Sequence, residues 1–349
     1  MTDFSYVGFV WLGTVGITFF TWLIVHFNGK VICALVDYFG FVFGISNQAN
    51  AKRTTWLNIA TEVEIILLGI MPLAIASLLS TANGNCYSSV NSFLLTEVAM
   101  LCLFFLIPRH LKQRQNFGGE HYYRSHWAVF VIAIVWCLVF AVWSESAINP
   151  QEYLGAERLL INKNADMWYY VRRYAAYTLD NLSFGSKPAC DYLQLSPKKL
   201  SSFIGSIIVY LTPNTTLGIT WFQGLLGCTL FLSLFGNWYG YSYQDKKLSS
   251  SGTITALIWA IASPAIFWLL ISAYLSNSLF ITIFVFGITA ARRISLNDLR
   301  YPGYAKYIIL FVFIINIFSF YLVVLPIALP FYLAVAVVYE SATYLNSKT

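Results

Sequence analysis

The sequence predicts an all-α, polytopic integral membrane protein: a bundle of about ten transmembrane helices with one additional re-entrant or interfacial helix. Of its 349 residues, 58% are hydrophobic and only 10% are charged, whereas soluble domains carry roughly 25% charged residues. Apolar runs of about 20 residues recur along the chain, which is the length that a helix needs to cross the hydrocarbon. Because the hydrocarbon offers no water to backbone groups, helices are expected to form the spans.

Ten apolar runs are predicted to cross the membrane. They are residues 6–26, 31–45, 56–80, 92–108, 127–145, 217–237, 253–275, 277–292, 305–322 and 325–345. The first run has no basic region before it and no small-residue cleavage site after it, so it is expected to remain as a span. The runs divide the chain into a four-span region, residues 1–126, and a six-span region, residues 127–349. The second region contains a long polar loop, residues 146–199.

The distribution of Lys and Arg predicts the orientation in the membrane. Thirteen of the 21 basic residues fall in loops on one side: Lys52, Arg53, Arg109, Lys112, Arg114, Arg124, Lys246, Lys247, Arg292, Arg293, Arg300, Lys306 and Lys348. Basic residues concentrate on the cytoplasmic side, so both termini are expected there and loop 146–199 on the outside. These loops and anionic membrane lipids explain the net charge of +6 better than nucleic acid does.

The predicted orientation of the later loops depends on whether residues 200–211 cross the membrane. This segment is apolar but only about a dozen residues long, and Thr212-Pro213-Asn214 follows it. This length favours a re-entrant or interfacial helix that dips in from the outer face. The alternative is a short, tilted span, which would place Lys246, Lys247 and the basic loop around Arg300 on the outside.

The polar loop holds the densest cluster of charged and aromatic side chains, residues 166–177. In a helix, Asp166, Tyr170 and Arg173 share one face, since they recur at steps of three and four residues. Arg172 and Arg173 are expected to hold a phosphate or diphosphate, and Asp166 to take a proton from a sugar hydroxyl. The alternative is an ordinary interfacial helix, because Trp and Tyr favour the headgroup level whatever the function.

Four acidic residues, Asp37, Glu62, Glu64 and Glu97, lie in predicted spans that contain no Lys or Arg to pair with them. Ionisable residues are costly in lipid and mark ion pathways or proton relays in many membrane proteins. A relay needs two or more of these acids to face each other. They therefore support an alternative function, a membrane transporter or flippase subunit.

Six cysteines are present, and four of them lie inside predicted spans, where thiols serve as small packing groups. Cys86 and Cys190 fall outside the spans and on the outward side, where a disulfide between them is possible. The alternative is a pair of free thiols. No metal site is expected, since no paired Cys or His spacing accompanies them. The chain also has no glycine-rich phosphate loop, no serine nucleophile elbow, no HExxH and no CxxC, so no cofactor is predicted.

The second half of the chain, about residues 127–295, resembles bacterial membrane polymerases of O-antigen and exopolysaccharide, and more loosely the glycosyltransferase C superfamily. The motifs that carry the resemblance are Asp166 with Tyr169-Tyr170, Ser196-Pro-Lys198, the short helix 200–211, Thr212-Pro-Asn-Thr215 and Ser263-Pro-Ala-Ile-Phe-Trp268. Where exopolysaccharide polymerases carry an Arg-Gln pair after the Pro-aromatic span, this chain has Ala273-Tyr-Leu-Ser-Asn277.

This resemblance implies transfer of a sugar or glycan from a polyprenyl-(di)phosphate-linked donor at the outer face of the bacterial inner membrane. By position, Asp166 matches the acidic residue that these families carry in the first outward loop. Arg172 and Arg173, with Lys198 and Lys199 nearby, are then the candidates for binding the donor diphosphate. The expected partners are the lipid-linked glycan, membrane lipids and other polysaccharide-assembly membrane proteins, but not nucleic acid. A third possibility is a non-catalytic subunit that uses the loop as a docking surface.

Overall fold

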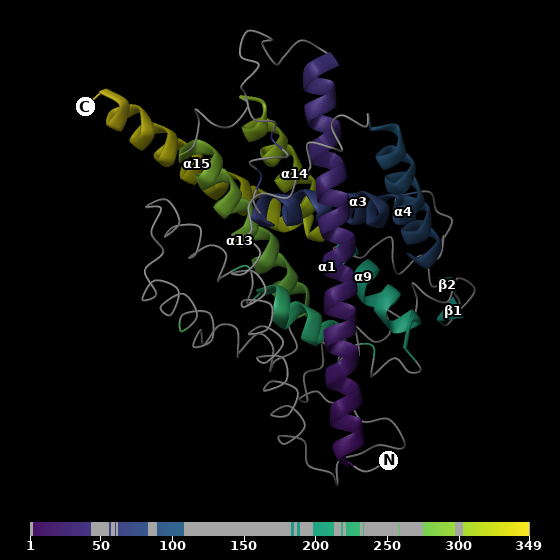
Figure 1. Ribbon diagram of the computed structural model, residues 1–349. Coiled ribbons are helices and arrows are strands. Elements are labelled where there is room, and N and C mark those ends of the chain that lie inside the picture. Colours follow the sequence, from purple (N-terminus) through teal and green to yellow (C-terminus); the bar gives the residue numbers. More distant parts are fainter. Residues whose placement is uncertain are drawn as a thin grey trace.

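The structure is a computed structural model, and its described residues form a bundle of helices (Figure 1). It describes residues 3–42, 56, 60, 62–82, 89–107, 183–184, 187–188, 198–212, 218, 221–230, 233, 258, 275–296 and 303–348. The helices are α1 (Asp3–Val42), α3 (Glu62–Ala82), α4 (Ser89–Leu106), α9 (Lys199–Tyr210), α13 (Leu275–Leu296), α14 (Ala305–Phe320), the 3-10 helix η3 (Leu322–Val324) and α15 (Leu325–Lys348). Residues 221–230 are also helical. The predicted helical fold is confirmed over these residues.

Within the polar loop, the structure describes two short strands, β1 (Ser183–Phe184) and β2 (Lys187–Pro188), which pair antiparallel. This pair is a small departure from the predicted all-α class. It has two residues in each strand, far fewer than an independently stable sheet needs.

The membrane assignment is confirmed by the length and composition of the helices. Among the described residues, four helical segments are long and apolar enough to cross a bilayer: Trp11–Gly40, Val63–Ser80, Ser276–Ser295 and Leu322–Ala342. Their surroundings differ, since 72% of the Val63–Ser80 segment is buried within the protein but only 11% of Leu322–Ala342. α15 extends away from the bundle (Figure 1) and carries many exposed large apolar side chains. An apolar surface of this kind suits contact with lipid.

The first two predicted spans, 6–26 and 31–45, are wrong as separate helices. The structure has one continuous helix of 40 residues, α1, in their place. At 1.5 Å per residue it is about 60 Å long, roughly twice the thickness of the hydrocarbon. A helix without a turn crosses the membrane once, so the chain has one crossing fewer than predicted in this region. The predicted span 127–145 lies outside the described residues, as does most of 253–275.

The polar residues that suggested a loop between these two spans instead face the interior of the bundle. Asn28 has no exposed surface, and Gly29 lies so close to α3 that a Cβ there would overlap the Ile65 carbonyl. One helical turn away, a Cβ on Gly69 of α3 would overlap the carbonyl of Val25. Small residues allow helix backbones to approach closely in membranes. α3 lies across α1 at this point (Figure 1).

Several helix ends meet near the carboxyl-terminal part of α1. α3 and α14 begin there and α13 ends there, because Glu64 of α3 lies near Arg293 of α13 and Tyr304 precedes α14 beside α1. The basic-residue count predicts that the loops at these three helix ends share one side of the membrane, and this stays a prediction. We refer to the region where these helix ends meet as the charged end of the bundle.

The predicted short helix at 200–211 is present as α9, which has 12 residues and is about 18 Å long. This is shorter than the hydrocarbon, which is about 30 Å thick, so α9 cannot cross unless the bilayer thins around it. It contacts α3, α4, α13 and α14, and Leu200 and Phe203 have no exposed surface. α9 is therefore packed among the helices of the bundle.

Candidate functional site

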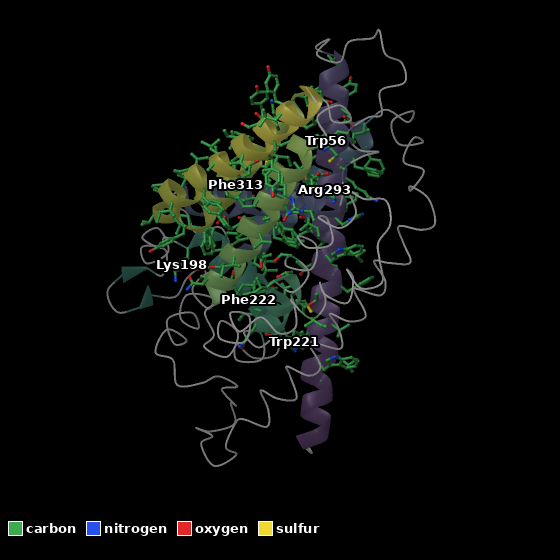
Figure 2. The ribbon with its side chains drawn as sticks, turned by 90° about the vertical axis from the view of Figure 1, so that its left-hand side faces the viewer. Trp56, Lys198, Trp221, Phe222, Arg293 and Phe313 are labelled. Carbon is green, nitrogen blue, oxygen red and sulfur yellow. The ribbon has the colours of Figure 1, made fainter. Side chains whose placement is uncertain are left out.

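The described residues bring one group of ionisable side chains together at the charged end of the bundle. We call it the Asp37 cluster: Lys30, Cys33 and Asp37 of α1, Trp56, Glu64 of α3, Arg293 of α13 and Tyr304. The three members on α1 recur at steps of three and four residues, so they share one face of that helix. Figure 2 shows Trp56 and Arg293 near each other beside α1, in the upper half of the view.

Asp37 is the hydrogen-bond centre of the cluster. Among the described residues, its Oδ1 accepts a hydrogen bond from the backbone N–H of Trp56 at 3.0 Å and another from the hydroxyl of Tyr304 at 3.1 Å. Asp37 is 9% exposed and Trp56 is fully buried. Hydrogen bonds to an ionised acceptor are stronger than those between neutral groups, and they offset the cost of burying the carboxylate.

Glu64 is the second carboxylate, and it has no exposed surface. Its Oε1 lies 4.0 Å from Nε of Arg293, which is an ion-pair distance and too long for a hydrogen bond. Both Asp37 and Glu64, and also Lys30, are close enough to Cys33 for their charges to act on its thiol. The cluster therefore contains two acidic and two basic side chains, whose formal charges cancel.

Tyr304 lies just outside α14, and its hydroxyl serves as a donor to Asp37. Burial, followed by the nearby charge of Asp37 and the hydrogen bond to it, raises the pKa of Tyr304 above its ordinary value. The phenol therefore keeps its proton throughout the physiological range. The Tyr304 hydroxyl therefore remains a hydrogen-bond donor to Asp37 over this range.

The other predicted intramembrane acids do not join the cluster in the same way. Glu97 of α4 accepts a hydrogen bond from Nδ2 of Asn28 at 3.0 Å. Asn28 Oδ1 is buried without a hydrogen-bond partner. Glu62 is the first residue of α3, and its side chain lies outside the described residues. Of the four acids, the structure thus brings Asp37 and Glu64 together and places Glu97 in a separate contact between α1 and α4.

Of the residues predicted to bind the lipid-linked donor, the structure describes Lys198 and Lys199. Lys198 caps the amino end of α9, where its carbonyl accepts hydrogen bonds from the hydroxyls of Ser201 and Ser202 at 3.2 and 3.0 Å. The hydroxyl of Ser201 also lies 2.9 Å from that of Ser276 on α13. Both lysines are half-buried, and Lys198 lies well away from Trp56 and Arg293 in Figure 2.

The remaining predicted site residues fall outside the described residues. They are Asp166, Tyr169, Tyr170, Arg172, Arg173 and the two cysteines of the possible disulfide, Cys86 and Cys190. Of the described cysteines, Cys33 and Cys102 are free thiols. Within the described ranges, no group of three His, Cys, Asp or Glu side chains is arranged to hold a metal ion.

Besides Cys33, Trp56 and Tyr304, two basic members of the Asp37 cluster were missed from the sequence. Lys30 falls between the predicted spans 6–26 and 31–45, and Arg293 directly follows the predicted span 277–292, so no basic partner for the acids was expected within the spans. Both residues in fact lie within helices, α1 and α13. The available signal was the spacing of Lys30, Cys33 and Asp37, which fits one face of a continuous helix.

Comparison of the chain with protein-family models, with curated proteins and with solved structures finds no match.

Proposed function

We propose that this chain is a membrane glycosyltransferase or polysaccharide polymerase that uses a polyprenyl-(di)phosphate-linked donor at the outer face of the bacterial inner membrane. The observation that carries the proposal is the packing of α9. This short helix is inserted among α3, α4, α13 and α14, and it directly follows the polar loop that contains the acidic-aromatic motif. Its amino end carries Lys198 and Lys199, which are half-buried at the point where the loop enters the bundle.

In the proposed reaction, residues of the loop and residues at the amino end of α9 have different roles. The oxygen of an acceptor hydroxyl attacks the anomeric carbon of the donor sugar, and the hydroxyl proton passes to Asp166. The bond between that carbon and the diphosphate oxygen breaks, and the lipid diphosphate leaves with the electron pair. Arg172 and Arg173 bind this leaving group, with Lys198 and Lys199 adding positive charge beside it. Tyr169 and Tyr170 stack on the sugar.

In this proposal loop 146–199 faces outward and the charged end of the bundle faces the cytoplasm. Because α1 crosses once, its amino end then lies outside, in contrast to the expectation that both termini are cytoplasmic. The carboxyl end of α15 remains inside. The positive-inside rule supports this orientation, since Lys52, Arg53 and Lys306 stay on the cytoplasmic side.

A second candidate function, a transporter or flippase subunit, is favoured by one observation. Asp37 and Glu64 converge in the Asp37 cluster together with Lys30 and Arg293. Ionisable residues that pair inside a membrane bundle occur in proton relays and ion pathways. The cancelling charges of the cluster are equally suited to holding helices together, so this observation ranks below the packing of α9.

One substitution series separates the two functions. If the chain is a glycosyltransferase, Asp166→Asn should lower the amount of glycan product by about a hundredfold or more, because a general base contributes at least that factor. The matched control is Asp180→Asn, which removes the same charge from the same loop and should leave the product unchanged. Glycan is measured by gel analysis of cells that depend on this chain, and protein level by immunoblotting of membranes.

The outcome that contradicts the enzyme proposal is an unchanged glycan pattern in Asp166→Asn at normal protein level. A transporter should instead lose function in Asp37→Asn or Glu97→Gln and tolerate Asp166→Asn. A docking subunit should keep the lipid-linked precursors unchanged but no longer co-purify with its membrane partners after changes in the loop.

A further inference from the structure

We propose that Asp37 is a clamp that closes the charged end of the bundle over Cys33, independently of the reaction proposed above. The clamp consists of one carboxylate oxygen on α1 and two donors from different parts of the chain, Trp56 and Tyr304. When both donors are bound, Cys33 is sealed from solvent. Loss of either donor opens this end locally and leaves the rest of the bundle closed.

Asp37 accepts hydrogen bonds from two segments that lie far apart in the sequence. Trp56 precedes α3 and Tyr304 precedes α14, and each donates to the same atom, Asp37 Oδ1, at 3.0 and 3.1 Å. One side chain on α1 therefore fixes the entrances of two other helices. Because both bonds end on one oxygen, removing the carboxylate releases both segments at once, whereas removing one donor releases one.

Both donor residues are also packed against neighbouring side chains or backbone. Their hydrogen bonds to Asp37 therefore fix the position of the packed residues as well. Trp56 is fully buried and belongs to the apolar core, and its carbonyl accepts a hydrogen bond from the N–H of Ala60 at 2.7 Å. The Tyr304 ring lies against α1 at Gly40, where a Cβ would come within 3.2 Å of it. A larger residue at position 40 would push this ring away from Asp37.

Cys33 lies one helical turn before Asp37 on the same face of α1 and has no exposed surface. Its thiol is unpaired and lies within reach of the charges of Asp37, Glu64 and Lys30. A buried thiol reacts only when the structure around it opens, so its reactivity measures local opening. Cys228, which is buried in the helical segment 221–230, provides the matching measure of opening elsewhere in the bundle.

The test is the rate at which N-ethylmaleimide modifies Cys33 in membranes that contain the full chain, followed by mass spectrometry of the Cys33 peptide. Asp37→Ala should raise this rate by about ten- to a hundredfold, the factor expected when hydrogen bonds to a charged group are lost. Tyr304→Phe keeps the ring and removes one donor, so it should raise the rate by a smaller factor. In both variants the modification rate of Cys228 should stay at the wild-type value.

The control is Glu340→Gln, which breaks the exposed ion pair between Lys306 and Glu340 and should leave the Cys33 rate unchanged. The proposal is overturned if Tyr304→Phe leaves the Cys33 rate at the wild-type value, because Asp37→Ala also removes a charge that acts on the thiol. It is also overturned if Cys33 and Cys228 become reactive together, because that result indicates general unfolding. If Asp37→Ala fails to accumulate, Tyr304→Phe decides alone.

Discussion

Glu64 and Arg293 form an ion pair at the charged end of the bundle. A carboxylate with no exposed surface is stable in an apolar bundle only when basic groups and hydrogen bonds compensate its charge. Arg293 lies 4.0 Å away and Lys30 is on the facing helix. Removing one member of such a pair leaves the other charge buried without full compensation, which costs more than removing both.

This predicts a non-additive pair of substitutions. Glu64→Gln and Arg293→Gln should each destabilise the protein by about 3–5 kcal/mol, and the double variant should be less destabilised than the sum of the two. Thermal unfolding in detergent micelles measures the three changes. The matched control is the exposed pair Lys306 and Glu340, 3.3 Å apart, for which the same series should change stability by at most about 1 kcal/mol. Additive effects at Glu64 and Arg293 would show that the two side chains do not interact.

Among the elements, α1 shows most clearly where the sequence was insufficient. Its two apolar runs were recognised, but the polar stretch between them was interpreted as a loop. Polarity alone does not distinguish a loop in water from a helix face that packs against other helices, and the buried Asn28 and the close contact of Gly29 show that this stretch is the latter. By contrast, the short helix α9 was predicted within one residue at each end, because its apolar run ends at a Thr-Pro-Asn break.

A single crossing by α1 gives a prediction for the orientation of its amino end. If the charged end of the bundle is cytoplasmic, Thr2→Cys should react with a membrane-impermeant maleimide in intact cells, and Ser347→Cys at the end of α15 should react only after lysis. Labelling is quantified on the peptide that contains each new thiol. Protection of Thr2→Cys in intact cells, together with labelling after lysis, would mean that α1 does not cross as a single span in this orientation.

For the whole molecule, composition and hydropathy sufficed to predict a helical membrane protein, because those properties follow directly from the solvent that the chain must face. The partners of the buried acids were not predictable in the same way. Asp37 meets Tyr304, and Glu64 meets Arg293, across very large separations in the sequence, so only the packing of α1, α3, α13 and α14 brings them together. Asp166, Arg172 and Arg173 stay predictions, since they lie outside the described residues.

The central claim is that the polar loop before α9 faces outward, where a lipid-linked glycan can reach it. The most direct test is to introduce Ser186→Cys, between β1 and β2, and to treat intact cells with a membrane-impermeant maleimide. The proposed orientation predicts that the peptide containing residue 186 is labelled in intact cells to the same extent as after lysis. If that peptide is protected in intact cells and labelled only after lysis, the loop faces the cytoplasm and the proposed reaction has no access to its donor.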